Sequence, residues 1–217
     1  MNHRVQGQYC QRYTGNPTSF LMTDPAPSKD ELRRSLRRRR AAIGPAKRNQ
    51  AATAAARLLD TLPHWSNCRH LGLYQPGSEE FDCMPIAQLA RDQGIALYLP
   101  VMEAQSRLSF AHWAEGAELA VNRYGIAEPA AAAERIAVSA LDLILVPLVG
   151  WDRRGGRLGM GGGYYDRTLA VDVRPVLVGL AYAAQEIAEV PMASWDIPLD
   201  YVLTERELVS VASIDDS

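Results

Sequence analysis

The feature that most constrains the fold is a stretch near the middle of the chain, from Leu143 to Ala170. An apolar run over residues 143–149 is followed by a polar turn and then by glycines at four of the five positions 159–163. The apolar run predicts a buried strand, and residues 164–170 can form a helix. A strand that leads through a glycine-rich loop toward a helix directs backbone N–H groups at an anion, because glycine allows close approach and positive φ. The stretch therefore predicts an α/β fold with a phosphate site after this strand.

Charged side chains flank the glycines. Arg157 precedes them and adds a permanent positive charge, and Asp166 follows them by about one turn with a carboxylate that can bind a metal ion. Together these groups suggest a nucleoside triphosphate bound with magnesium. The loop matches neither familiar phosphate motif, because it has no Gly-Lys-Ser/Thr and because Tyr164 stands where the third dinucleotide glycine would be. A glycine-rich turn that is packed for structural reasons is the competing interpretation.

Composition narrows the class of protein. The chain has 217 residues, 47% apolar residues and a net charge of −2, which fits one domain with a substantial core and gives no overall attraction to nucleic acid or to a membrane surface. Three cysteines without a CxxC motif favour reduced thiols and a cytoplasmic location. No apolar run approaches the roughly 18 residues that span a bilayer, and the four scattered histidines do not have zinc-ligand spacing. We also expect a monomer.

The two ends differ from the central part of the chain. Residues 1–27 contain glycines and prolines that break any periodicity, and they have no apolar signal-peptide core. We interpret them as a disordered leader or as an over-long choice of start, with Met22 as a natural beginning. Residues 28–210 are expected to form the globular α/β domain, and residues 211–217 a flexible tail.

Along the central part, helical and strand patterns alternate. Ser28 and Glu31 have the spacing of a capping box, so a helix should begin at Lys29. Further helices are expected over residues 46–62, 84–93 and 164–170, and strands over residues 69–74, 95–101, 108–113, 143–149, 176–181 and 201–204. This alternation predicts a single-domain α/β fold with an open, mostly parallel sheet flanked by helices. In such sheets ligands bind beyond the carboxyl ends of strands, where the glycine loop and the loop of residues 75–82 are expected.

The first predicted helix carries a run of basic residues at positions 33, 34 and 37–40. On a helix these side chains spread around the cylinder, so most of them should be solvated. The run is short and has no interleaved aromatic residues, which disfavours a nucleic-acid-binding helix. One or two of these arginines, with Lys29, could still reach a phosphate site.

Several motifs occur in an order that points to one known family. The most specific is Asp-x-x-Gly-x-Arg-Leu-Gly-x-Gly-x-Gly-Tyr-Tyr-Asp, which spans Asp152 to Asp166. The others are Lys29 with Leu32-Arg33, Tyr74 with Glu80, Arg123 with Gly125-Ile126 and Glu128-Pro129, and Pro191 with Asp196 and Asp200. From residue 29 to residue 205 the chain resembles the 5-formyltetrahydrofolate cyclo-ligases, which are also called methenyltetrahydrofolate synthetases.

The resemblance implies an activity that depends on ATP and magnesium. In this reaction the formyl group on nitrogen 5 of the folate is closed onto nitrogen 10, which yields 5,10-methenyltetrahydrofolate, ADP and phosphate. The route proposed for the family phosphorylates the formyl oxygen first. Phosphoryl transfer depends on positioning and on charge neutralisation, and the cationic residues and glycines of this chain can supply both. The implied partners are 5-formyltetrahydrofolate and ATP, with Mg²⁺ as cofactor.

The resemblance also implies roles for individual residues, with Arg157 and Tyr164 assigned to catalysis. The implied ATP contacts are Lys29, Arg33, Arg157, Leu158, Gly159, Met160, Gly161, Gly162, Gly163, Tyr164 and Tyr165. Asp166 and Asp196 are implied as magnesium ligands. The implied folate contacts are Gln75, Glu80, Tyr124, Met160, Gly161, Gly162, Gly163 and Tyr164. A carboxylate such as that of Glu80 can accept paired hydrogen bonds from the amino and ring N–H groups of a pterin.

Alternatives remain open at this stage. Some relatives have a lysine in the glycine loop where this chain has Gly162. Asp196 could instead cap a turn, Glu79 leaves the register of Glu80 ambiguous by one residue, and one of the two loop tyrosines could be a packing residue. A non-catalytic nucleotide or sugar-phosphate sensor is the first competing function, although it would not need two carboxylates that can bind a metal. An RNA-interacting protein is the second, and the net charge disfavours it.

Overall fold

The computed structural model describes residues 27–211. Its centre is an eight-stranded sheet in the order β12-β11-β10-β7-β1-β2-β3-β6. These strands are β1 (His70–Gly72), β2 (Ala96–Met102), β3 (Leu108–His112), β6 (Arg135–Ile136), β7 (Leu143–Pro147), β10 (Val176–Leu180), β11 (Tyr201–Leu203) and β12 (Leu208–Ser210). The five strands from β11 to β2 run parallel, and β12, β3 and β6 pair antiparallel at the two edges. The predicted open, mostly parallel α/β sheet is confirmed.

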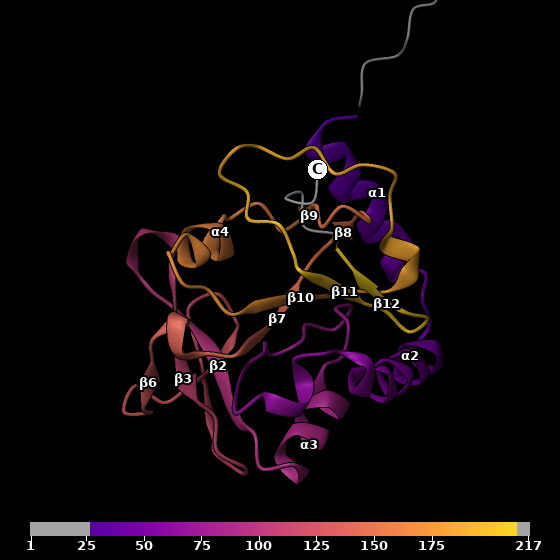
Figure 1. Cartoon of the computed structure of the whole chain (residues 1–217). Coiled ribbons are helices and arrows are strands. Elements are labelled where there is room, and N and C mark those ends of the chain that lie inside the picture. The colour runs from indigo at the N-terminus through magenta and orange to yellow at the C-terminus, as the bar shows by residue number, and fades with distance from the viewer. Residues whose placement is uncertain (1–26, 212–217) are drawn as a thin grey trace, which may run out of the picture.

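Helices cover both faces of the sheet. Helices α2 (Pro45–Leu58) and α3 (Met84–Asp92) lie on one face, and α1 (Lys29–Ala41) and α4 (Tyr164–Leu169) lie on the other, beside the small hairpin β8–β9 (Gly150–Trp151 and Arg157–Leu158) (Figure 1). Short 3-10 helices occupy Leu59–Thr61, Trp65–Asn67, Ala104–Ser106, Val138–Ala140 and Ala183–Gln185.

The central strand β7 shows how the two layers are built. Leu143 and Leu145 pack into the core beneath α2 and α3, whereas Ile144 and Val146 pack into the core on the α4 side. All four side chains are fully buried. The sequence of this strand is therefore a continuous run of apolar residues and does not alternate between apolar and polar ones. Successive side chains of a strand point to opposite faces, and a strand covered on both faces must therefore be apolar throughout.

The first helix begins where its capping box predicts. The Ser28 hydroxyl accepts the backbone N–H of Glu31, and the Glu31 carboxylate accepts the backbone N–H of Ser28 at 2.8 Å. These two bonds satisfy N–H groups that a helix start otherwise leaves unpaired. Leu36 is buried against Val149 and Leu158, which fixes α1 over the start of the glycine loop.

Some local predictions differ from the structure. No strand was predicted between residues 113 and 143, but residues 119–121 form β4 (Leu119–Val121) and residues 127–129 form β5 (Ala127–Pro129), which pair antiparallel. The intervening turn is closed by Asn122, whose side-chain oxygen accepts the backbone N–H groups of Tyr124 and Ile126, and by Gly125 at φ +76°. The second helix ends at Leu58 rather than at residue 62, and its last turn continues as a 3-10 helix.

The remaining sequence predictions concern the chain ends and membranes. The proposed leader, residues 1–27, and the proposed tail, residues 211–217, lie outside the described residues except for Pro27 and Val211. Within residues 27–211, none of the helices has the length and apolar character needed to cross a bilayer.

Candidate active site

A cavity of about 1110 Å³ opens beyond the carboxyl ends of β1, β2 and β7. Its wall is formed by the loop after β1, the ends of β2 and β7, the hairpin β4–β5, the glycine loop, one side of α1 and the segment around residue 195. The lining residues are Lys29, Arg33, Arg40, Tyr74–Glu80, Pro100, Met102, Leu108, Gly125–Glu128, Pro147, Arg157–Arg167, Ala170, Trp195 and Asp196. Both loops that the sequence places at carboxyl ends of strands therefore line the same cavity.

The glycine loop is supported by a buried carboxylate. Asp152 is 1% exposed and accepts backbone N–H groups from Arg154, Gly156 and Val190 at 2.7–3.0 Å. These bonds fix the β8–β9 turn and therefore the position at which Arg157 leaves it. Asp152 is a structural residue, since its hydrogen bonds are all directed to backbone groups of the turn and of the neighbouring loop.

Two glycines of the loop have backbone conformations that favour glycine. Gly161 has φ +103° and Gly163 has φ +66°, in the region that side-chain-bearing residues rarely adopt. A Cβ at Gly161 would lie 3.4 Å from the Arg33 guanidinium carbon, an ordinary contact distance, so the backbone conformation rather than a lack of space favours glycine there. The glycines therefore shape the loop and bring its backbone close to α1.

Three cations lie at one end of the cavity, and each is already in contact with an acidic or carbonyl group. Lys29 Nζ lies 2.7 Å from Asp196 Oδ2, and an Arg157 Nη atom lies 2.5 Å from Asp166 Oδ1. Arg33 donates from Nε to the Gly159 carbonyl at 2.9 Å. We call the group formed by Lys29, Arg33, Arg157, Asp166 and Asp196 the cationic end. It brings together residues that the sequence analysis assigned to ATP and to magnesium.

Asp166 and Asp196 each keep one carboxylate oxygen without a hydrogen-bond partner among residues 27–211. Burial raises the pKa of Asp196, but hydrogen bonds from the Ala193 backbone and from Lys29 outweigh that effect and hold the pKa below its ordinary value. The Ile197 N–H is bonded to the Asp166 carboxylate, which places Asp166 beside the Asp196 segment. In each carboxylate a single oxygen makes these bonds.

This donor set can be compared with what magnesium requires. Residues 27–211 contain no cluster of three or more His, Cys, Asp or Glu side chains that could hold a metal ion alone. Magnesium is usually bound by only one or two carboxylates, together with water and substrate phosphates. The two carboxylates therefore fit a magnesium ion that is held jointly with a nucleotide.

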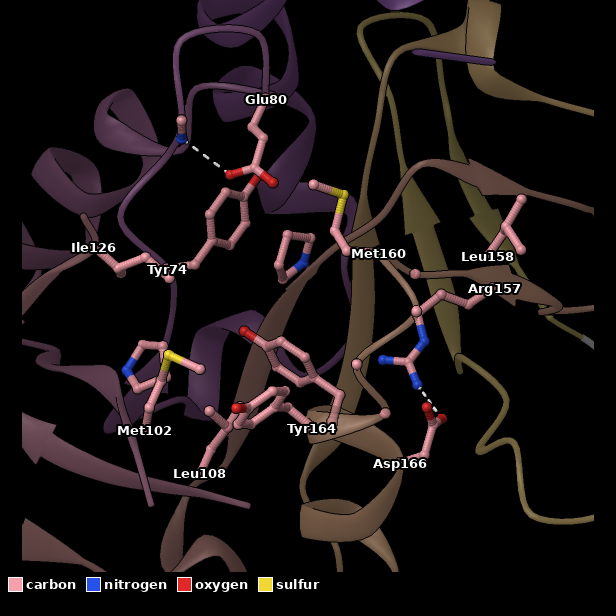
Figure 2. A pocket seen from close by; sticks show the side chains of 18 of the residues that line it. Tyr74, Glu80, Met102, Leu108, Ile126, Arg157, Leu158, Met160, Tyr164 and Asp166 are labelled. Carbon is pink, nitrogen blue, oxygen red and sulfur yellow. Dashed lines mark hydrogen bonds and ion pairs between the residues drawn. The ribbon is translucent and has the colours of Figure 1, made fainter. Parts of the chain in front are cut away.

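The opposite end of the cavity combines polar acceptors with apolar walls. Glu80 faces Arg157 and Asp166 across the cavity, with Tyr74 beside it and with Met160 and Tyr164 between (Figure 2). The Gly77 N–H donates to Glu80 Oε2 at 2.9 Å, which fixes the carboxylate. Gln75 Oε1 is buried and has no hydrogen-bond partner within the part of the chain that the structure describes. Side chains of Met102, Leu108 and Ile126 complete this wall (Figure 2), and we call it the acceptor end.

Both tyrosines after the glycine loop line the cavity. Tyr164 and Tyr165 are each partly buried, and Tyr165 also packs against the core on the α4 side. Burial raises the pKa of Tyr165, and the nearby Arg157 guanidinium, 5.7 Å from the ring centroid, offsets only part of that effect. Tyr165 is therefore a neutral phenol at neutral pH. The expectation that one tyrosine faces the ligand and the other packs in the core stays a prediction.

The folate contact expected of Tyr124 stays a prediction. Tyr124 is 54% exposed and is not among the residues that line the cavity, and its ring lies 4.8 Å from the guanidinium carbon of Arg123. The turn of the β4–β5 hairpin directs Ile126 into the cavity wall instead. Leu158 was implied as an ATP contact, but its side chain is 1% exposed and packs against Leu36. Leu158 can offer a ligand only its backbone.

The cavity contains residues that the sequence analysis did not assign to it. Arg40 is 5% exposed and lines the cavity, and Trp195 lines it while 73% exposed. Arg40 lies on the same helical face as Lys29 and Arg33, and this spacing could have predicted that Arg40 lines the cavity. Trp195 is adjacent to Asp196 in the sequence, and this position could have predicted that the tryptophan lies at the cavity. The apolar residues Met102 and Leu108 gave no signal that separates them from ordinary core residues.

A cavity with a cationic end and an acceptor end, located at the carboxyl edge of a parallel sheet, is typical of an enzyme that binds a phosphate-bearing substrate beside a second small molecule. Comparison with known proteins identifies the family. The family model of the 5-formyltetrahydrofolate cyclo-ligases matches residues 25–205, and the chain belongs to this family.

Curated relatives and solved structures agree with this assignment. The chain is 34% identical over 178 residues to a 5-formyltetrahydrofolate cyclo-ligase of Escherichia coli, an alignment that covers 80% of this chain and 98% of the relative. It is 30% identical to the enzyme of the same name from Haemophilus influenzae, with 81% and 96% covered. The solved structure of a 5,10-methenyltetrahydrofolate synthetase from Aquifex aeolicus has a TM-score of 0.75 and 32% identity, and covers 85% of this chain and 93% of its own.

Proposed function

We propose that this protein converts 5-formyltetrahydrofolate to 5,10-methenyltetrahydrofolate with ATP and Mg²⁺. The formyl oxygen attacks the γ-phosphorus of ATP, and the bond from that phosphorus to ADP breaks. Nitrogen 10 then attacks the formyl carbon, and the carbon–oxygen bond breaks to release phosphate, which takes the proton of nitrogen 10. One folate and one ATP give one methenyl product, one ADP and one phosphate.

The observation that carries the proposal is the presence of both ends in one cavity. The cationic end suits a triphosphate, and the acceptor end suits a flat heterocycle with N–H donors. Figure 2 shows Arg157 and Asp166 on one side and Glu80 with Tyr74 on the other. A volume of about 1110 Å³ is slightly above the usual range for a small-molecule site, roughly 300–1,000 Å³, which accommodates two substrates side by side.

At the cationic end the residues bind and orient the triphosphate. Arg157 is held by its bond to Asp166, and its side chain is only 4% exposed. A guanidinium in such a protected place interacts more strongly with a phosphate than an exposed one, because water screens it less. Lys29 and the backbone of residues 159–163 lie on the same wall. Asp166 and Asp196 would hold magnesium, which when bound would neutralise phosphate charge.

At the acceptor end the residues bind the pterin. The Glu80 carboxylate and the unpaired Gln75 oxygen are two acceptors on one wall, and the amino and ring N–H groups of a pterin are donors. A buried acceptor without a partner costs free energy, so a ligand that supplies a donor recovers this loss. The apolar side chains of Met102, Leu108 and Ile126 can cover the faces of the rings and keep water from the formyl group.

The experiment is an absorbance assay for the methenyl product. The purified protein is mixed with 5-formyltetrahydrofolate, ATP and magnesium, and each component is then omitted in turn. We expect methenyl product only in the complete mixture. One ADP and one phosphate should form for each molecule of methenyl product. Product formation without ATP, or ATP hydrolysis without folate at the same rate, would contradict the proposal.

A further inference from the structure

Arg40 is a buried cation that lacks a counter-ion. It is 5% exposed, its Nε is buried without a hydrogen-bond partner, and it makes no ion pair with any residue between 27 and 211. Lys29, Arg33 and Arg157, which line the same cavity, each form an ion pair. Burying an unpaired charge is costly, and a protein that keeps one next to a ligand cavity has a group ready for an anion.

Arg40 extends the cationic end along α1. A helix turns by about 100° per residue, so positions 29, 33 and 40 fall within roughly 40° of one another around the axis. All three side chains line the cavity, and positions 33 and 40 are separated by about 10 Å along the helix. Arg34, Arg37, Arg38 and Arg39 are exposed. The face of α1 toward the cavity therefore carries three cations, and Arg40, the last of them, makes no ion pair among the described residues.

The loop after β1, which forms the acceptor end, is joined to neighbouring elements. The Tyr182 hydroxyl donates to the Glu80 carbonyl at 3.3 Å, and the Tyr182 ring lies 4.7 Å from that of Phe81. Arg48 ties the same loop to the end of α1 by donating to the carbonyls of Ile43 and Ser78. Arg40 thus lines the same cavity as Lys29 and Arg33 of α1 and as Glu80 of the loop after β1.

We propose that Arg40 binds the transferred phosphate group as it passes from ATP to the formyl oxygen and leaves as inorganic phosphate. The two substrates carry other anions, namely the carboxylates of the folate glutamate tail. A flexible, strongly hydrated tail is best placed in solvent, whereas Arg40 is in the interior. The phosphate group is the anion that must occupy the interior between the two substrates. This inference rests on the proposed function and assigns it a further catalytic residue.

The positive charge of Arg40 would stabilise the negative charge of the transferred phosphate group. When the formyl oxygen attacks and the bond to ADP breaks, negative charge is spread over the three phosphoryl oxygens. A guanidinium fixed beside those oxygens stabilises them without reorganisation of solvent. The same contact would hold the phosphate group on the formyl oxygen until nitrogen 10 displaces it.

The first test measures phosphate binding without turnover. Thermal unfolding of the unliganded protein is followed in inorganic phosphate and in sodium chloride of equal ionic strength. We expect phosphate to raise the Tm of the wild type and to raise that of Arg40→Met much less. Arg39→Met is the matched control, since it removes an exposed arginine from the adjacent position and should keep the full phosphate effect. Equal responses from Arg40→Met and the wild type would overturn the inference.

The stability of the variant is itself informative. Replacing an unpaired buried charge with an apolar side chain of similar length removes a desolvated group, so Arg40→Met without phosphate should have an unchanged or higher Tm. A large fall in Tm, or failure to fold, would show that the guanidinium is a structural group and would overturn the inference.

The second test separates the phosphate from the folate carboxylates. Arg40→Met should lower kcat by on the order of 100-fold, leave the KM for folate nearly unchanged and weaken product inhibition by phosphate. Arg40→Lys should restore part of kcat. A raised folate KM with unchanged kcat and phosphate inhibition would assign Arg40 to the glutamate tail instead. If the wild type lacks cyclisation activity but its Tm still responds to phosphate through Arg40, the proposed function fails while the anion site stands.

Discussion

The ammonium nitrogen of Lys29 lies 2.7 Å from Oδ2 of Asp196, although the two residues are 167 positions apart. This bond joins the first residue of α1 to the loop that follows β10, directly at the cavity. The Asp196 side chain is 14% exposed and that of Lys29 is 36% exposed. Because Asp196 also accepts the Ala193 N–H, its carboxylate organises the loop as well as the cavity rim. The predicted magnesium ligand is therefore also part of the tertiary structure.

The Lys29–Asp196 pair predicts a pH dependence of stability. The pKa of Asp196 is lowered in the folded protein, so its contribution is fully present above the ordinary aspartate pKa near 4 and is lost as pH falls through the lower folded value. We expect Asp196→Asn to reduce the free energy of unfolding by about 1 kcal/mol at pH 7, a value kept low because Lys29 is partly exposed.

Urea unfolding at a series of pH values measures this contribution. The difference between wild type and Asp196→Asn should shrink steadily below about pH 4. Asp172→Asn is the control, because Asp172 is exposed and makes no ion pair within the described part of the chain. A difference that is constant from pH 7 to acid pH would show that the carboxylate charge contributes nothing.

Arg157 is expected to bind the phosphates of ATP. Arg157→Ala removes a charge-assisted contact worth about 1.5–3 kcal/mol, so turnover or ATP affinity should fall at least about tenfold. Arg154→Ala is a matched control, since Arg154 lies in the same hairpin turn with a side chain that is 62% exposed. Steady-state kinetics with varied ATP, together with nucleotide titration calorimetry, measure both quantities. Unchanged kinetics in Arg157→Ala would remove this residue from the site.

The sequence predicted the features of the fold that depend on local pattern. The Ser28 cap, the position of the glycine loop between a buried strand and a helix, and the mostly parallel sheet follow from spacing and periodicity, and these predictions are confirmed. The exposed position of Tyr124 could not be predicted, because the direction of a turn residue depends on Asn122 and Gly125, which set the hairpin geometry. The sequence showed six arginines on α1, and helical spacing places Arg40 on the face of Lys29 and Arg33, but the burial of Arg40 could not be read from that spacing alone.

Other features depend on tertiary contacts between distant segments. The burial of Arg40 depends on the elements that pack around α1, and the bond between Arg157 and Asp166 depends on how the glycine loop folds back. The edge strand β12 was not predicted, because its apolar signal is only three residues long and it is completed by antiparallel pairing with β11. Such contacts are set by packing, which single-sequence patterns do not encode.

Asp166 is expected to position magnesium with the nucleotide. Asp166→Asn keeps the size of the side chain but weakens its affinity for a hard divalent ion. Turnover should then need a higher magnesium concentration, while folate binding measured without metal should change little. The substitution also weakens the bond to Arg157, so the ATP dependence is recorded in parallel. If folate binding collapses to the same extent as turnover, Asp166 has a structural role.

Glu80 is expected to fix the pterin. Its carboxylate faces the cavity and is held in place by the Gly77 N–H. Removing a charged acceptor leaves the pterin donors unpaired, which costs about 2–4 kcal/mol. Glu80→Ala should therefore raise the KM for 5-formyltetrahydrofolate strongly, with a much smaller effect on ATP. Because the same carboxylate also closes the loop, Glu80→Gln is measured beside it. The amide oxygen of glutamine can still accept the Gly77 N–H, so loop order should be largely retained while pterin affinity falls.

Glu79 provides the internal comparison, since it is the adjacent residue, has the same chemistry and lines the same cavity. It makes no hydrogen bond with a side chain or backbone group among residues 27–211, so Glu79→Ala should be nearly silent in both KM values. Circular dichroism melting of all three variants checks that the loop remains folded. If Glu79→Ala raises the folate KM and Glu80→Ala does not, the register of the loop is off by one residue. If neither variant affects folate, the pterin is bound by other groups, and Gln75, whose buried oxygen has no partner, becomes the next residue to change.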